Sequence, residues 1–161
     1  MNYKRFTGMA VLFLFLVFPA SASMVSLLLV ETGLNERAPR SQVTSAWEGG
    51  LLSAFFDAGY IVTNSPIARV ASKPSPYISG SIERDFNDAI LGGADFFILG
   101  FVEYRLQNGR PVPVEVALKI YSTNTKKLLY EQNFPAGTGR NLADEYRFAQ
   151  DAGRVIVSHL R

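Results

Sequence analysis

The pattern of hydrophobic and polar positions changes its period several times along the chain, and each change predicts a different element. Residues 96 to 99 are all apolar, and from Val102 onward apolar and polar residues alternate. A continuous apolar run is typical of a strand buried on both faces, whereas alternation is typical of a strand with one exposed face. We therefore predict one long strand, buried at its start. The alternation in 113–121 and 127–134 predicts that this strand leads a three-stranded meander.

Shorter patterns predict two further strands and three helices. The apolar run 24–30 predicts a buried first strand, and 60–63 predicts a short second strand. Apolar residues spaced by three or four positions predict amphipathic helices. Their stripes are Val43, Trp47, Leu51, Phe55 and Ala58; Ile82, Phe86, Ala89 and Ile90; and Leu142, Tyr146, Ala149, Ala152, Ile156 and Leu160. The order β-α-β-α-β-β-β-α predicts an α/β chain of two-layer α+β type, with a mixed sheet of about five strands and helices mainly on one face.

Polar and small residues at the ends of these stripes predict where the helices begin and end. Ser41 is the predicted N-cap of the first helix, and Gly59 is the residue just beyond its end. Ser79 or Ser81 is predicted to cap the second helix, and the third begins at Asn141. Inside the first helix, the pair at 49–50 should cost about 1 kcal/mol per glycine relative to alanine. We interpret this pair as a close approach of the helix to the sheet, with a kink as the alternative.

The register of the meander is predicted from its two faces. Asn108-Gly109 favours a two-residue type I′ turn, but that turn would pair Glu103 with Val114 and mix polar with apolar side chains. We therefore predict a longer, odd-numbered loop centred near Arg110. The predicted pairs are Leu106 with Val114, Tyr104 with Val116, Val102 with Leu118, and Arg105 with Glu115. In this register Glu115, Lys119 and Tyr121 lie on the face that meets water or a partner.

The segment 64–80 is rich in proline and serine and predicts a long loop. Its prolines, at 66, 74 and 76, exclude a helix or a central strand. Loops of this length in a compact domain are often functional. We predict that it is the main partner-binding surface, through Arg69, Lys73, Tyr77 and Ile78, with Tyr77 as the anchor; a solvated connection is the alternative. The second choice is the meander face that carries Arg105, Glu115, Lys119 and Glu131.

The first 22 residues have the pattern of a secretory signal peptide. Lys4 and Arg5 precede a short apolar run from 9 to 18, and small residues at 20–22 form an A-x-A site. We predict cleavage after Ala22, with 23–161 as a single domain; a retained membrane anchor is the alternative. The mature chain is then expected to be exported, periplasmic or beyond, and soluble, with no stable membrane span and no lipid-bearing cysteine.

Charge and composition exclude several classes of function. The predicted signal removes two of the 16 basic residues, which leaves 14 basic and 14 acidic residues in the mature chain. A neutral domain does not support nucleic-acid binding, which needs clustered surplus Lys and Arg. The chain has no cysteine, which excludes disulfides, thiol catalysis and Cys-ligated zinc.

Isolated polar residues do not combine into a catalytic pattern. The only histidine, His159, is predicted to be a helix-end cation or a surface residue. Gly137-Thr138-Gly139-Arg140 precedes a helix and is read either as an anion-binding start or as an ordinary flexible cap. Asp57 and Asp95 lie at element ends, where Asp commonly caps. We therefore assign no catalytic, cofactor-binding or metal-binding residue.

Three segments carry a resemblance to a known superfamily. They are LSAFFDAGYIV at 52–62, GADFFILGFV at 93–102 and VALKIYSTNTKKLLYE at 116–131. Together they resemble the bacterial envelope superfamily of the curli secretion protein CsgG, the penicillin-binding-protein activator LpoB and the amino-terminal domain of TolB. In that group a "D-x-x-T-G-K" corner turns the meander; here Ser122 and Lys126 replace its Asp and Gly. The resemblance implies a periplasmic, non-catalytic adaptor domain.

Two classes of function follow. The first is an exported, non-catalytic adaptor or assembly module of the cell envelope that binds another protein; its oligomeric state is open, with a homo-oligomer as one option. The second is a small periplasmic hydrolase or ligand-binding carrier whose site is formed by loop contacts. A deep polar pocket with convergent titratable groups would favour the second class.

Overall fold

The computed structural model describes residues 22–35, 39–74, 78–137 and 141–160. The elements are β1 (Met24–Thr32), α1 (Gln42–Asp57), β2 (Ile61–Asn64), β3 (Ala68–Val70), α2 (Ser81–Leu91), β4 (Phe96–Gln107), β5 (Arg110–Ser122), β6 (Leu128–Pro135) and α3 (Leu142–Ser158). The predicted order of strands and helices is confirmed, with one additional strand, β3.

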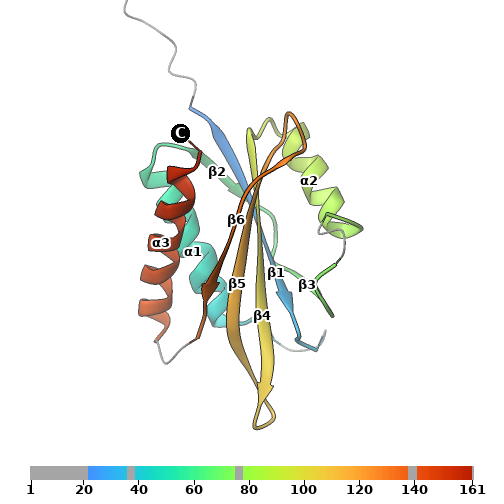
Figure 1. Cartoon of the computed structure of the whole chain (residues 1–161), viewed down its shortest axis with the longest axis vertical. Coiled ribbons are helices and arrows are strands. Elements are labelled where there is room, and N and C mark those ends of the chain that lie inside the picture. Colours follow the sequence, from blue (N-terminus) through green and yellow to red (C-terminus); the bar gives the residue numbers. More distant parts are fainter. Residues whose placement is uncertain (1–21, 36–38, 75–77, 138–140, 161) are drawn as a thin grey trace, which may run out of the picture.

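All six strands belong to one mixed sheet with the order β2-β1-β4-β5-β6 (Figure 1). β1 is parallel to β2, β3 and β4, whereas β4, β5 and β6 form the antiparallel meander. β2 pairs with the first half of β1 and β3 with its second half. The segment predicted as a loop at 64–80 therefore contains a three-residue edge strand. β3 lies between Pro66 and Pro74, and an edge strand tolerates nearby proline because its outer side needs no ladder hydrogen bond.

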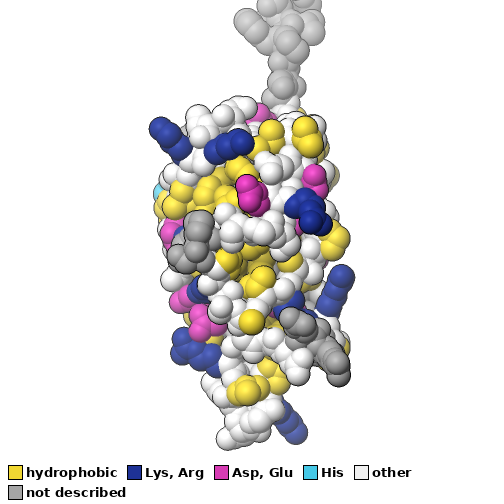
Figure 2. Space-filling view, turned by 90° about the vertical axis from the view of Figure 1, so that its right-hand side faces the viewer, with side chains coloured by type: hydrophobic (Ala, Val, Ile, Leu, Met, Phe, Trp, Pro, Cys, Tyr) yellow, Lys and Arg dark blue, Asp and Glu magenta, His cyan; other side chains and the backbone are white. Residues whose placement is uncertain are grey.

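Two helices cover one face of the sheet and the third covers the other (Figure 1). α1 and α3 pack on the face that carries Val25, Leu27, Ile98 and Leu118. α2 packs on the opposite face, where Phe86 contacts the rings of Phe97 and Tyr121. The helices are thus mainly on one face, as predicted, and the sheet has a hydrophobic cluster on each side. Viewed from the α2 side, acidic and basic side chains lie near one another and form no field of one sign (Figure 2).

The glycines inside α1 mark a contact between helices. A Cβ atom built on Gly50 would lie 2.4 Å from the carbonyl oxygen of Tyr146 and 2.7 Å from the Cβ of Ala149. On the other helix, a Cβ atom on Gly153 would lie 2.6 Å from the Cβ of Ala54. The prediction of a close helix-to-sheet approach was therefore wrong, because the partner of Gly50 is the backbone of α3.

One of the two predicted N-caps is confirmed, and so is the predicted start of the third helix at Asn141. The Ser41 hydroxyl accepts from the Val43 N–H at 3.2 Å, and the Asn141 side chain accepts from the Asp144 N–H at 2.9 Å. The prediction for α2 was wrong: its N-cap is Gly80, with φ 57°, and no side chain caps it. Ser81 is already the first helical residue, so its hydroxyl is past the capping position. Gly59 follows the end of α1 with φ 88°, as predicted.

The predicted register of β4 and β5 was wrong. Asn108 and Gly109, with φ 50° and 75°, form the two-residue turn that the face argument had rejected. The register then shifts at a β-bulge, because Tyr104 lies opposite Pro113 while Glu103 lies opposite Glu115. The extra residue returns the apolar positions of β5 to the α1 face. A bulge thus resolves the conflict that a regular ladder would have created.

Candidate functional site

The carboxyl end of β1 is the point where the parallel part of the sheet changes direction. After β1 the chain crosses through α1 to β2 on one side, and it later returns through α2, on the opposite face, to β4 on the other side. In open sheets such a switch point leaves a crevice outside the strand ends, where ligands commonly bind. A cavity of about 330 Å³ lies here, lined by Thr32, Gly33, Ala71, Ser72, Lys73, Glu103 and Tyr104.

Lys73 ties the segment after β3 to the antiparallel strands. Glu103 and Glu115 are direct cross-strand partners, an arrangement that is destabilising for like charges. The Lys73 ammonium lies 3.4 Å from a Glu103 oxygen and 3.2 Å from a Glu115 oxygen, so it bridges the two. Arg105 adds a second cation, 2.9 Å from Glu103. These ion pairs hold one wall of the cavity in place.

The positive charges around Glu103 lower the pKa of its carboxyl group. Burial alone would raise the pKa of Glu103, but hydrogen bonds and charge attraction from Arg105 and Lys73 outweigh it, and the pKa lies below its ordinary value of 4.5. A carboxylate held ionised in this way does not accept a proton readily. Glu103 therefore suits an electrostatic tie better than general acid–base catalysis.

The lowered pKa predicts a pH dependence of folding stability. The contribution of Glu103 is complete above the unfolded-state pKa, near 4.5, and is lost as the pH falls through the lower folded-state pKa. We expect Glu103→Gln to be less stable than the wild type by at most about 1 kcal/mol at neutral pH, and the difference should shrink in acid. Urea titrations of both proteins across this range measure it. A difference that stays constant with pH would contradict the assignment.

Tyr104 forms the inner wall of the cavity. Its hydroxyl lies 2.7 Å from the Thr44 hydroxyl, and the side chain is buried. Burial raises the pKa of Tyr104 above 10, against the opposing effect of hydrogen bonds from Ser41 and Thr44. The phenol therefore stays protonated at neutral pH. Gly33 lies against this residue with φ 78°, and a Cβ atom there would be 2.2 Å from the Tyr104 carbonyl oxygen.

A buried ion pair lies on the α1 side of the same strand end. The Glu31 side chain is 1% exposed and binds the Arg69 guanidinium, whose Nε is 3.1 Å away. Glu31 also accepts from the Ser41 N–H at 3.1 Å, at the start of α1. Arg69 donates further to the carbonyls of Asn35 and Pro39. Arg69 thus joins β3, β1 and the loop before α1.

The structure places the residues of the first predicted surface in different settings. Arg69 and Lys73 form the internal ion pairs described above, and Ile78 is half-buried against the α2-side cluster. Tyr77 lies outside the described residues. Arg69 and Lys73 both lie near the switch point, but they are on opposite faces of the sheet and bind different carboxylates. Their contact with a partner remains a prediction.

The second predicted surface contains a residue that is not exposed. Lys119 is 1% exposed, and its ammonium lies 2.5 Å from Glu131, its cross-strand partner on β6. The expectation that Lys119 faces water was wrong, because Ala117 and Tyr121, on the same side of β5, belong to the cluster under α2. Arg105 pairs with Glu103 and does not lie opposite Glu115.

Sequence reasoning missed two buried carboxylates, Glu31 and Glu145. Glu145, in the first turn of α3, is 0% exposed. It accepts from the Trp47 indole N–H and from the Gly137 N–H, both at 2.7 Å. The Gly137 N–H, which belonged to the anion-binding alternative for 137–140, is therefore bound by the chain's own carboxylate. Residues 138–140 lie outside the described ranges. The sequence did contain a signal for a buried acceptor: Trp47 lies on a stripe predicted to be buried, and a buried indole N–H needs a hydrogen-bond acceptor.

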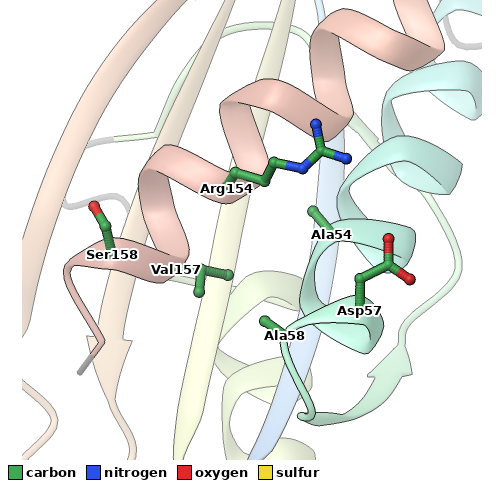
Figure 3. A pocket seen from close by; sticks show the side chains of 6 residues that line it. All are labelled: Ala54, Asp57, Ala58, Arg154, Val157 and Ser158. Atoms are coloured by element: carbon green, nitrogen blue, oxygen red, sulfur yellow. The ribbon is translucent and has the colours of Figure 1, made fainter.

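The remaining polar candidates have local partners. Asp95 accepts from the Met24 N–H at 2.9 Å, and His159 caps α3 and stacks on Tyr130 with ring centroids 3.7 Å apart. A second hollow, of about 260 Å³, lies between the ends of α1 and α3 (Figure 3). Its charged residues, Asp57 and Arg154, bind Gln150 at 3.3 Å and Asp151 at 2.7 Å, and the hydroxyl of Ser158 donates to the Val155 carbonyl at 2.6 Å. Among the described residues, Ser158 and Asp57 therefore have other partners, and no hydrogen bond joins this hydroxyl to this carboxylate.

The described residues lack two features that would narrow the class of site. No group of three or more His, Asp and Glu side chains in these ranges could hold a metal ion. Within the same ranges, no helix is long and apolar enough to cross a membrane.

Comparison with solved structures shows a known fold. The chain is similar to the PelC dodecamer from Paraburkholderia phytofirmans, at 12% identity over 86% of this chain and 87% of that one, with a TM-score of 0.51. It is also similar to TolB from Acinetobacter baumannii (12% identity, 86% of this chain, 28% of that one, TM-score 0.46) and to the LpoB C-terminal domain from Salmonella enterica (10%, 75%, 87%, 0.43). TolB and LpoB are proteins of the superfamily that the sequence resembles. The likeness to PelC, at 12% identity, shows the fold alone. Comparisons with protein-family models and with curated proteins found no match.

Proposed function

We propose that the chain is an exported, non-catalytic module of the cell envelope that binds another protein. The observation that carries this proposal is that the charged side chains at the switch point bind one another. Lys73 bridges Glu103 and Glu115, and Arg69 binds Glu31. These contacts hold the segment around β3 in one position, and a preorganised surface loses little conformational entropy when it binds.

The same contacts favour binding over catalysis. A general base must hold a pKa near the working pH and reach the proton it removes. Glu103 has a lowered pKa, and the Tyr104 phenol has a raised one, so neither titrates near neutrality. The likeness to the fold of PelC, whose structure is described as a dodecamer, agrees with a role in assembly.

The proposed contact surface is the segment 64–80. In this proposal Arg69 and Lys73 hold the segment, while Tyr77 and Ile78 contact the partner. Aromatic side chains held on a rigid support commonly dominate binding energy. Because the ion pairs would be formed before binding, the partner need not supply charges to release them.

Removing the aromatic anchor should weaken binding strongly. Once cross-linking in envelope extract has identified a partner, calorimetry should show that Tyr77→Ala loses about 2 kcal/mol, or about thirtyfold in affinity. Tyr146→Ala is the matched control, since Tyr146 is 38% exposed on α3, away from this segment.

Two results would redirect the proposal. Normal binding by Tyr77→Ala together with weak binding by Arg105→Ala would move the contact to the meander face. Recovery of a small molecule, with no cross-linked protein, would favour a ligand carrier.

A further inference from the structure

The two edges of the sheet are built differently. At one edge, β2 and β3 are four and three residues long and are separated by a segment that contains Pro66. Short strands and proline protect an edge against pairing with another chain. At the other edge, β6 is eight residues long; a bulge at Leu129 and a proline at its last position lie at its two ends, and from Tyr130 to Phe134 it pairs with β5 without interruption. β6 ends the strand order (Figure 1), and its central stretch from Tyr130 to Phe134 contains neither a bulge nor a proline.

The hydrogen bonds of β6 show which of its backbone groups face outward. The Ala136 N–H donates to the Val114 carbonyl at 3.1 Å, in continuation of the β5–β6 ladder. Hydrogen-bonded pairs recur at every second residue of an antiparallel ladder, so Phe134, Gln132 and Tyr130 bond to β5. The N–H and C=O groups of Glu131 and Asn133 then point away from β5. β6 ends the strand order, and no other described strand pairs with this side.

We propose that this edge binds β6 of a second copy, so that two sheets join across a two-fold axis. This inference does not rest on the proposed binding of another protein. In an antiparallel arrangement, Glu131 of each copy lies opposite Asn133 of the other, and the two pairs form four backbone hydrogen bonds. Each carboxylate then lies beside an amide.

Neighbouring registers are worse on charge and on hydrogen bonding. A shift of two residues one way sets Glu131 against Glu131 of the second copy, and like charges directly opposite are destabilising. A shift the other way sets Glu131 against Pro135, which has no N–H to donate. The proposed register avoids both.

The other face of the joined strands is also self-complementary. Tyr130, Gln132 and Phe134 lie on the α1 and α3 side, since their cross-strand partners belong to that cluster. In the proposed register Tyr130 lies opposite Phe134 of the second copy, and aromatic cross-strand pairs are favourable. Gln132 lies on the axis, opposite itself.

A single cysteine on the axis tests the geometry directly. The chain has no cysteine of its own. Residues in a non-hydrogen-bonded antiparallel pair have Cα atoms about 4.5 Å apart, within the range of a disulfide. Under mild oxidation, Gln132→Cys should form a covalent dimer at least about tenfold faster than Asn87→Cys, a control at an exposed position of α2. Equal rates would overturn the proposal.

Two substitutions of opposite charge test the register. Asn133→Lys sets a cation opposite Glu131 of the second copy, whereas Asn133→Glu sets an anion there. Sedimentation of the protein recovered from cells should give dimer dissociation constants that differ by about tenfold or more, with the lysine variant tighter. Asn87→Lys and Asn87→Glu should match the wild type. A monomer at every concentration, or no difference between the two variants at 133, would overturn the proposal.

Discussion

Replacing Arg69 with methionine should lower the free energy of unfolding by about 3–5 kcal/mol, because it removes the cation from a buried ion pair. The Glu31 side chain is 1% exposed and would keep, of its described contacts, the Ser41 N–H. A carboxylate in that setting is costly to leave charged. Urea titration followed by the fluorescence of Trp47, the only tryptophan and fully buried, measures the change.

The control for Arg69 is an exposed arginine in an ion pair of the same type. Arg105 binds Glu103, but its side chain is 68% exposed, so Arg105→Met should cost less than about 1 kcal/mol. The double variant Glu31→Gln/Arg69→Met should recover part of the loss, because it removes both charges. If Arg69→Met lost as little free energy of unfolding as Arg105→Met, the Glu31–Arg69 ion pair would not be important for stability.

The order of elements was predictable because it depends on local periodicity. The stripe of α2, for example, places Ile82, Phe86 and Ala89 on one side at helical spacing, and all three are buried. The long strand β4 was likewise read from its change of pattern at Val102. Such signals need only a few neighbouring residues, and one sequence contains them.

Features that depend on two distant segments were not predictable in the same way. The bulge opposite Tyr104 inserts one residue into β5, and a face argument based on strict alternation excludes it. The burial of Lys119 depends on α2, which covers the face that alternation alone assigns to water. In both cases the alternation was read correctly from the sequence. The segment that packs against it, or the inserted residue, could not be read from that local pattern.

One departure from the resembled superfamily has a visible backbone consequence. At the corner between β5 and β6, Lys126 stands where the superfamily pattern has glycine, and it adopts φ 56°. Residues other than glycine rarely adopt this conformation. Lys126 therefore holds a backbone conformation that glycine adopts without strain.

Replacing Gly50 with alanine should destabilise the protein by about 3 kcal/mol, near the upper end of the range for overpacking. The added methyl group would meet the Tyr146 carbonyl oxygen at 2.4 Å and the Ala149 Cβ at 2.7 Å. These atoms belong to the α3 backbone or are attached directly to it, so they cannot move aside without separating the helices. The loss exceeds the gain of about 1 kcal/mol that alanine brings to a helix interior.

The adjacent glycine is the matched control for this prediction. A Cβ atom on Gly49 would approach only the ring of Tyr146, at 3.2 Å, and that side chain is 38% exposed and can shift. Gly49→Ala should therefore be neutral or stabilising, by up to about 1 kcal/mol. Chemical denaturation of the two variants should give changes of opposite sign or very different size. Equal changes would mean that helix propensity, rather than the contact between α1 and α3, determines the effect of both glycines.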